Sequence, residues 1–345
     1  MKPVSVIIPT ANRPKFLEEA LSSVAQQTAL SEIEEVIVSE NGSNHESQAV
    51  CAKFKSLPIR YIFQDPPISA LKHINVLAKQ ARAEFIAILH DDDWWGPEHL
   101  ARSLQALNSH PDSVAVFSNY YKTTGPSVPF YLNDHTWLIW VISGRNFADP
   151  VVVLDEVSTM FVCLAWSWWG NAHYSTLVGR SDAMRDAISR NSVIGNYYDN
   201  DRQFLVFLSL RGKICYLTMP EVFIRSHQVQ ESNKESYSRF VELMIQTTRW
   251  LVKSFPENAA KAKELFNTTA SGLEPDRLLA ISNLLIKQLR PVLIEECGLK
   301  FIPVPPEKRG PHDPHIKCLL RQICPPVLWN AMHKAKSMLI KGAHG

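Results

Sequence analysis

The sequence predicts an α/β fold, a mostly parallel sheet flanked by helices and followed by a helical C-terminal extension. Over about the first 230 residues, short apolar and β-branched segments alternate with segments whose apolar residues recur at helical spacing. Polar turns follow several of the apolar segments directly. Strand–helix alternation with short turns favours parallel pairing, because each helix returns the chain to the start of the next strand.

The first part of the chain supplies four expected strands, each followed by a helical pattern. The strands are apolar and mostly β-branched, and they cover residues 4–8, 36–38, 59–62 and 85–89. The helices carry apolar residues on one face, and they cover residues 16–27, 46–55, 70–81 and 99–107. Residues 85–89 are apolar without interruption, which is typical of a strand buried on both faces.

The rest of the chain is less regular. Residues 123–155 contain prolines and no clear period, so we expect an irregular flap or insertion there. The remaining elements of the α/β part are strands at 114–117, 175–178 and 214–217, a helix at 204–210, and a closing segment at 223–227.

We therefore expect three regions: an α/β domain at 1–232, a helical extension at 233–300, and a Pro-rich linker with a basic amphipathic tail at 301–345. From residue 308 onward, seven basic residues are opposed by one acid, and apolar residues lie between them at helical spacing. Such a tail suits an anionic membrane surface, or else a helix that packs on the domain and exposes its basic face. Both alternatives stay open.

Composition describes a soluble globular protein. Of the 345 residues, 46% are apolar and 20% charged, and a net charge of +2 gives no reason to expect nucleic acid as a partner. The six cysteines show no zinc-like spacing, which favours reduced thiols. No signal peptide is expected, and no apolar run approaches the roughly 20 residues that span a bilayer. We expect a cytoplasmic protein, with the tail as its candidate for peripheral contact at the inner face of the membrane.

Three adjacent carboxylates, Asp91, Asp92 and Asp93, follow the buried strand at 85–89. Oxygen-rich clusters bind hard divalent cations such as Mg²⁺ or Mn²⁺, usually together with the phosphates of a substrate. A solvated acidic turn is the alternative, but a buried strand before the acids and two tryptophans after them favour the metal site. The polar turns 10–13 and 40–43 follow neighbouring expected strands, so all three turns should meet at one edge of the sheet.

Five motifs along the chain resemble the family-two glycosyltransferases, which are inverting enzymes with the GT-A nucleotide-sugar fold, a Rossmann-like sheet. The motifs are Val4–Arg13, Glu40-Asn41-Gly42-Ser43, His90-Asp91-Asp92-Asp93 with Trp94 and Pro97, Asn200-Asp201, and Arg225-Ser226-His227. They occur in the order of the family and span about residues 3–230. The C-terminal third lies outside the resemblance.

The resemblance implies a nucleoside-diphosphate sugar as donor, most often a UDP-sugar. The residues that would bind it are Pro9, Thr10, Asn12, Arg13, Glu40, Asn41, Asp91 and Arg225. Asp92 and His227 would hold Mn²⁺ or Mg²⁺ at the two phosphates, and Asp201 would deprotonate the acceptor hydroxyl. The acceptor would be a surface glycan or a lipid-linked saccharide, received near Trp168 and Trp169.

Several positions depart from the family pattern. His90 replaces the first carboxylate of the metal motif, and Glu40-Asn41 replaces two aspartates. Asn200 replaces the acid before the base, and losing that neighbouring charge would lower the pKa of Asp201.

Structural roles compete with these assignments. Asp199 competes with Asp201 as base, and either residue could simply cap the helix that follows. Glu40 could be an ordinary turn residue, His227 a structural histidine, and the tryptophans part of an aromatic core.

Two other functions fit a similar sheet. A sugar nucleotidyltransferase would need a glycine-rich loop after the first strand, and Pro9–Arg13 contains no glycine. A non-catalytic carbohydrate-binding protein could retain the same scaffold.

Overall fold

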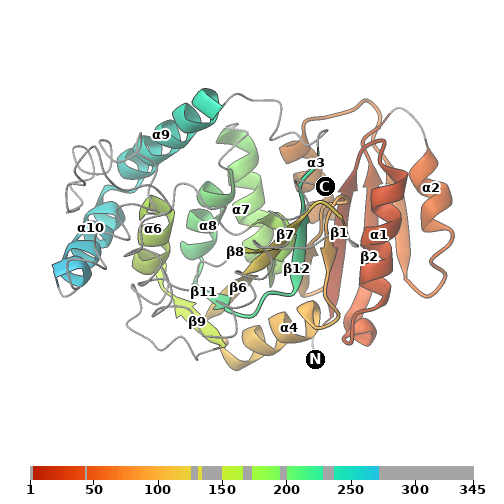
Figure 1. Ribbon diagram of the computed structural model, residues 1–345, viewed down its shortest axis with the longest axis horizontal. Coiled ribbons are helices and arrows are strands. Elements are labelled where there is room, and N and C mark those ends of the chain that lie inside the picture. The colour runs from red at the N-terminus through yellow and green to blue at the C-terminus, as the bar shows by residue number, and fades with distance from the viewer. Residues whose placement is uncertain are drawn as a thin grey trace, which may run out of the picture.

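The computed structural model describes residues 3–42, 45–125, 131–133, 150–165, 173–194, 200–227 and 237–271. A central sheet lies between layers of helices, and two further helices pack at one end of the molecule (Figure 1). The expected residues Asp199, Trp168 and Trp169 and the tail at 301–345 lie outside the described ranges. Among the described helices, none is both long and apolar enough to cross a membrane.

Eight strands form the central sheet in the order β3-β2-β1-β4-β10-β6-β11-β9. Their bounds are β1 Val4–Thr10, β2 Ile33–Glu40, β3 Ile59–Phe63, β4 Phe85–Ile88, β6 Ser113–Ser118, β9 Val151–Leu154, β10 Val178–Arg180 and β11 Lys213–Leu217. Strands β10 and β9 run against the other six. The expected α/β fold with a mostly parallel sheet is confirmed.

Helices cover both faces of this sheet, which explains why its central strands are apolar without interruption. On one face, α1 (Pro14–Ala25), α2 (Glu46–Cys51) and α4 (His99–Ser109) pack against Val6, Ile8 and Ala87. The other face packs against α3 (Ala70–Gln80), α6 (Glu156–Ala165), α7 (Ser181–Ile194) and α8 (Asn200–Ser209). Successive β1 residues, such as Ile7 and Ile8, therefore enter opposite cores.

A second, smaller sheet brings together two segments that are distant in the sequence, the residues before β5 and the residues after β12. Its strands, in the order β5-β12-β7-β8, are β5 Trp94–Trp95, β12 Val222–Arg225, β7 Tyr120–Thr123 and β8 Tyr131–Asn133. Strand β12 pairs antiparallel with β5, with Phe223 opposite Trp94. The residues after β12 are thereby brought beside the residues before β5.

Two sequence-based expectations about secondary structure were wrong. Residues 123–155 are not wholly irregular, because they contribute β8, which pairs with the preceding strand β7, and β9, which pairs with the distant strand β11. Residues 175–178 do not form one strand: Tyr174–Thr176 is a 3-10 turn, η2, and β10 begins only at Val178. Helix α7 was not anticipated.

The helical extension packs on the α/β domain in its described part. Helices α9 (Tyr237–Ser254) and α10 (Pro256–Ser271) contact α6, and Leu251, Ala259 and Ala262 belong to the same apolar cluster as one face of the sheet. The expected boundaries at 232 and 300 stay predictions, since the described helices end at residue 271.

Candidate active site

The acidic loop, residues 89–93, leaves the C-terminal end of β4 and enters β5. Strand β4 pairs with β1, so the loop meets the turn that follows β1. Asp91, Asp92 and Asp93 are all buried, with 0%, 7% and 1% of their surface exposed. Because buried carboxylates repel one another, the surrounding fold must supply cations and hydrogen-bond donors.

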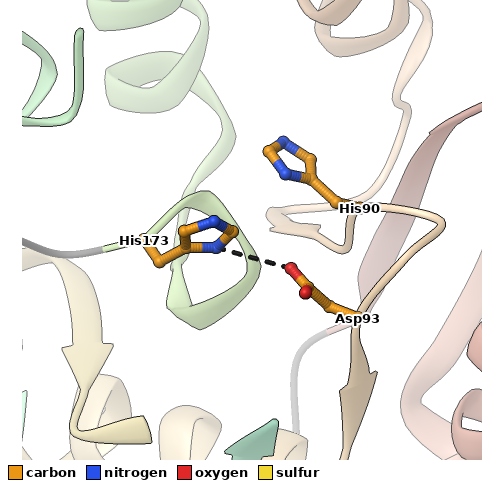
Figure 2. A group of neighbouring side chains, drawn as sticks. All are labelled: His90, Asp93 and His173. Carbon is orange, nitrogen blue, oxygen red and sulfur yellow. Dashed lines mark ion pairs between the residues drawn. The ribbon is translucent and has the colours of Figure 1, made fainter. Parts of the chain in front are cut away.

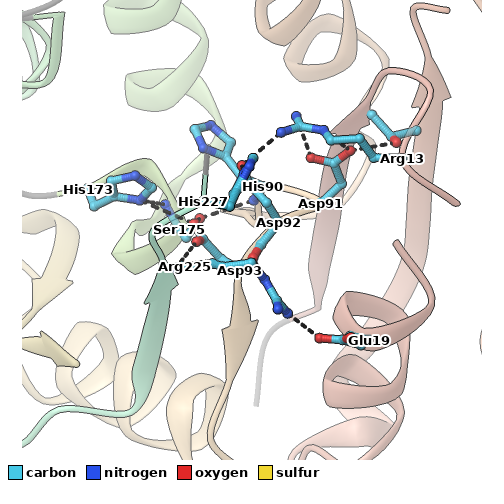
Figure 3. A network of polar contacts seen from close by, with 11 residues as sticks. Arg13, Glu19, His90, Asp91, Asp92, Asp93, His173, Ser175, Arg225 and His227 are labelled. Carbon is cyan, nitrogen blue, oxygen red and sulfur yellow. Dashed lines mark hydrogen bonds and ion pairs between the residues drawn. The ribbon is translucent and has the colours of Figure 1, made fainter. Parts of the chain in front are cut away.

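Arg13, in the turn after β1, supplies positive charge to this loop (Figure 3). Its Nη2 lies 2.7 Å from Asp91 Oδ1, its Nε donates to Asp91 Oδ2 at 3.0 Å, and its Nη1 donates to Asp92 Oδ2 at 2.8 Å. The planar guanidinium thus bridges two carboxylates. About a third of the Arg13 side chain, 32%, remains exposed, so it still presents a cationic surface beside the loop.

Asp91 lies beneath Arg13 instead of at an open surface. Thr10 Oγ1 donates to Asp91 Oδ2 at 2.7 Å, and the carboxylate is completely buried. Burial raises the pKa of Asp91, and the ion pair with Arg13 opposes that rise. In this arrangement Asp91 orients Arg13, while the contact of Asp91 with the donor, expected from the sequence, stays a prediction.

Asp92 and His227 lie together although 135 residues separate them. His227 Nε2 is 3.0 Å from Asp92 Oδ2, and the two side chains are 11% and 10% exposed. Burial alone would raise the pKa of Asp92, but Arg13, His90 and His227 hold it below its ordinary value. Asp92 is therefore the carboxylate of this loop that stays ionised.

This pair fits a divalent metal ion. Two ligands of one ion, each about 2.1 Å from it, lie about 3 Å apart when they are adjacent, which matches the Asp92–His227 spacing. One carboxylate and one imidazole leave coordination positions for phosphate oxygens and water. An imidazole ligand favours Mn²⁺ over Mg²⁺.

Asp93 points into the protein, away from any exposed surface. Ser175 Oγ donates to its Oδ2 at 2.6 Å, and the backbone N–H of Arg225 donates to its Oδ1 at 3.0 Å. Burial, reinforced by the charge of Asp92, raises the pKa of Asp93 well above its ordinary value. Through these two hydrogen bonds Asp93 joins the acidic loop to Ser175 and to β12.

Arg225 ties the loop to helix α1. Its Nε donates to the carbonyl oxygen of Asp92 at 2.9 Å, and its guanidinium pairs with Glu19. The guanidinium also lies between the rings of Phe16 and Trp94, with its central carbon 4.5 and 4.8 Å from their centroids. With only 5% of its side chain exposed, Arg225 is placed to hold the backbone of Asp92. Its donor contact, expected from the sequence, stays a prediction.

We expect Arg225→Lys to lower the free energy of unfolding by about 1–3 kcal/mol, because lysine keeps the charge but loses the planar stacking and the fixed fork of donors. Urea denaturation measures this change. Arg190→Lys is the matched control: Arg190 is 52% exposed in a surface ion pair, and its replacement should change stability by less than about 0.5 kcal/mol. Equal effects of the two substitutions would contradict the buried role of Arg225.

The turn after β1 and the turn after β2 meet beside Arg13. Asn12 adopts a positive φ of 55°, and its N–H donates to Glu40 Oε1 at 2.9 Å. Glu40 is completely buried, and its Oε2 accepts no hydrogen bond within the described residues. A Cβ at Gly42 would lie 2.4 Å from Asn12 Oδ1, so any larger residue there would force the Asn12 side chain to move. Asn41 instead exchanges two hydrogen bonds with the backbone of Ile68, which makes it a support for this turn.

Asp201 lies in the first turn of α8, directly after Asn200 of the same motif. Burial raises its pKa to about 7. Tyr174 packs on the same helix, with its ring centroid 5.1 Å from that of Phe204, and burial and then the charge of Asp201 raise the pKa of Tyr174. Tyr174 in turn contacts the ring of His90, with centroids 5.8 Å apart. Asp201 thus belongs to the surroundings of the acidic loop, and its pKa is that of a general base working near neutral pH.

We expect turnover to fall about tenfold per pH unit below pH 7, because a base acts only when deprotonated and the raised pKa of Asp201 is about 7. A base with an ordinary aspartate pKa, about 3.9, would keep nearly full activity down to about pH 5. The measurement is kcat at saturating donor and acceptor. Donor affinity over the same range serves as the control, since it reports the acidic loop instead of Asp201.

Three residues of this network were not singled out from the sequence: Glu19, His173 and Ser175. Glu19 looks like an ordinary exposed helix residue. His173 lies 3.5 Å from Asp93 through its Nδ1, and Ser175 donates to the same carboxylate. Neither residue belongs to a motif, so only their position after folding reveals them.

The sequence was compared with those of known proteins and protein families. The sequence profile of glycosyl transferase family 2 matches residues 5–165, which include the turn after β1 and the acidic loop. Protein CgeD of Bacillus subtilis is 30% identical over 123 residues, covering 33% of this chain and 28% of CgeD. Glycosyltransferase GlyG of Streptococcus pneumoniae is 24% identical over 156 residues, covering 45% of this chain and 48% of GlyG. The matched part thus spans less than half of either curated relative.

Solved structures share the fold. The crystal structure of S. aureus TarS 1-349 in complex with UDP-GlcNAc superposes with a TM-score of 0.55 at 18% identity, covering 85% of this chain and 78% of that one. The sheet with its flanking helices is therefore a GT-A fold. The part of the chain that carries the acidic loop, residues 5–165, is similar to glycosyl transferase family 2.

Proposed function

We propose that this protein transfers a sugar from a nucleoside-diphosphate sugar to an acceptor hydroxyl with inversion at the anomeric carbon. The observation that carries the proposal is the ionised Asp92, placed 3.0 Å from His227 and 2.8 Å from Arg13 at the C-terminal edge of the sheet. Ligands in open α/β sheets bind at that edge. A carboxylate, an imidazole and a guanidinium together form a site for a metal-bound diphosphate.

Each part of the donor has a group suited to it. The exposed part of Arg13 faces the diphosphate as a cation. Glu40, with one oxygen that accepts no hydrogen bond within the described residues, is the candidate acceptor for an N–H of the nucleobase. When bound at Asp92 and His227, Mn²⁺ or Mg²⁺ neutralises charge on the departing diphosphate.

Asp201 is the proposed general base. It removes the proton of the acceptor hydroxyl as that oxygen bonds to the anomeric carbon, and the bond from this carbon to the diphosphate breaks with its electron pair. The proposed acceptor is a surface glycan or a lipid-linked saccharide. Contact of the basic tail with an anionic membrane is proposed on the sequence alone.

Release of UDP by the purified full chain tests the proposal. UDP-GlcNAc is the first donor to try, because the TarS structure that shares the fold was solved with it. We expect UDP release that requires Mn²⁺ and stops on chelation. Tight donor binding with no release across an acceptor panel would indicate a carbohydrate-binding protein. Formation of a nucleoside triphosphate from pyrophosphate would indicate a sugar nucleotidyltransferase.

A further inference from the structure

His90, Asp93 and His173 form a second group of metal-ligating side chains beside the Asp92–His227 pair (Figure 2). His90 and Asp93 come from the acidic loop, and His173 directly precedes η2. One ligand atom from each residue lies within 4.8 Å of the other two. The rings of His90 and His173 meet edge to face with centroids 5.2 Å apart.

Two hydrogen-bond acceptors face one another inside this group. His173 Nδ1 accepts a hydrogen bond from the backbone N–H of Ser175 at 3.3 Å, so this nitrogen carries a lone pair. The same nitrogen lies 3.5 Å from Asp93 Oδ2. A lone pair opposite a carboxylate oxygen is unfavourable unless a proton or a metal cation lies between them, and either one can occupy this position.

The spacing and the chemistry suit a transition metal. Two ligands of a tetrahedral ion, each bound at about 2.0–2.1 Å, lie about 3.3 Å apart, close to the 3.5 Å found here. His90 is only partly buried, so rotation of its side chain can bring the third ligand in. Two imidazole nitrogens and one carboxylate oxygen favour Zn²⁺ or Co²⁺ over Mg²⁺ and Ca²⁺.

We propose that His90, Asp93 and His173 bind a transition-metal ion of the Zn²⁺ class at a site separate from the Asp92–His227 pair. Ser175 already donates to Asp93 Oδ2, which leaves a second lone pair of that oxygen for the ion. An ion there joins the acidic loop to η2, and so fixes the backbone on which Asp92 is carried.

Titration of the untagged, chelator-treated full chain with Co²⁺ alone tests this site. Co²⁺ bound by nitrogen and oxygen ligands in a tetrahedral or five-coordinate site absorbs visible light, and Zn²⁺ should displace it whereas Mg²⁺ should not. We expect one such Co²⁺ per chain. His173→Gln and His90→Gln should each abolish the band. His110→Gln is the matched control, because the His110 ring contacts the carbonyl oxygen of Ala106 in α4, and it should keep the band.

Asp92→Ala separates this site from the donor site, and the band should survive that substitution. Absence of the band in the unmodified chain, or an undiminished band in His173→Gln, would overturn the proposal. Loss of the band in Asp92→Ala would also overturn it, since a single ion would then be shared across the loop. Urea denaturation of each variant verifies folding, and His173→Gln decides the outcome if His90→Gln unfolds. The titration uses no nucleotide, so its result is independent of whether sugar transfer occurs.

Discussion

Replacing Asp201 with Asn is expected to lower kcat by about 10²–10⁴-fold, the usual contribution of a positioned general base. Asparagine keeps the shape of the side chain but cannot take a proton from the acceptor hydroxyl. Donor affinity should stay unchanged, because the acidic loop and Arg13 remain intact. Turnover at saturating substrates and titration with UDP and Mn²⁺ measure the two quantities separately.

Asp199→Asn is the control that distinguishes between the two candidate bases, Asp201 and Asp199. Asp199 is two residues away in the same motif and is the competing carboxylate from the sequence. Activity that survives in Asp201→Asn and collapses in Asp199→Asn would assign the base to Asp199. Asp182→Asn, at an acid that is 71% exposed in the first turn of α7, should leave turnover unchanged.

Asp92→Ala is expected to remove the effect of Mn²⁺ on UDP affinity. In the unmodified chain, Mn²⁺ should tighten UDP binding, because Asp92 and His227 together hold the ion at the diphosphate. Without Asp92, His227 is the single protein ligand left at this position. Metal-free UDP binding should persist or improve, because Arg13 loses its bond to Asp92 and can turn to the phosphates.

Isothermal titration with UDP, with and without Mn²⁺, measures both parts of this result. Asp112→Ala is the matched control, since the Asp112 side chain is 78% exposed and lies outside the loop. If Mn²⁺ still tightens UDP binding in Asp92→Ala to the same extent, Asp92 is not a metal ligand.

The residues at the C-terminal edge of the central sheet could be predicted from the sequence, because local patterns show where each strand ends. Apolar strands that end in polar turns place Thr10, Glu40 and Asp91 at one edge, and the structure brings these turns together. Burial could not be predicted in the same way. The sequence suggested a lowered pKa for Asp201 from the loss of one neighbouring charge, but desolvation dominates and raises it to about 7.

The remaining differences between the sequence-based expectations and the structure arise from contacts between separate segments of the chain. The strands β8 and β9 are only three and four residues long, and their partners in the sheets are β7 and β11. Ser175 was expected in a strand, yet its hydroxyl and carbonyl bind Asp93 and Trp95 from a turn. Arg225 belongs to a recognisable motif, but its enclosure by Phe16 and Trp94 depends on three segments meeting.

The pairing of β5 with β12 has a consequence for how this fold tolerates changes in loop length. Asp92 lies two residues before β5 and His227 two residues after β12, so the register of one short ladder sets their separation. The length of the loops between β5 and β12 does not determine this separation. Insertions in the loops of that stretch would not move the two side chains apart as long as the strands and Ser175 keep their places, whereas a one-residue slip in the ladder would displace them by about 3.3 Å. The separation of Asp92 and His227 therefore depends on the pairing of β5 with β12 and not on the length of the loops between these strands.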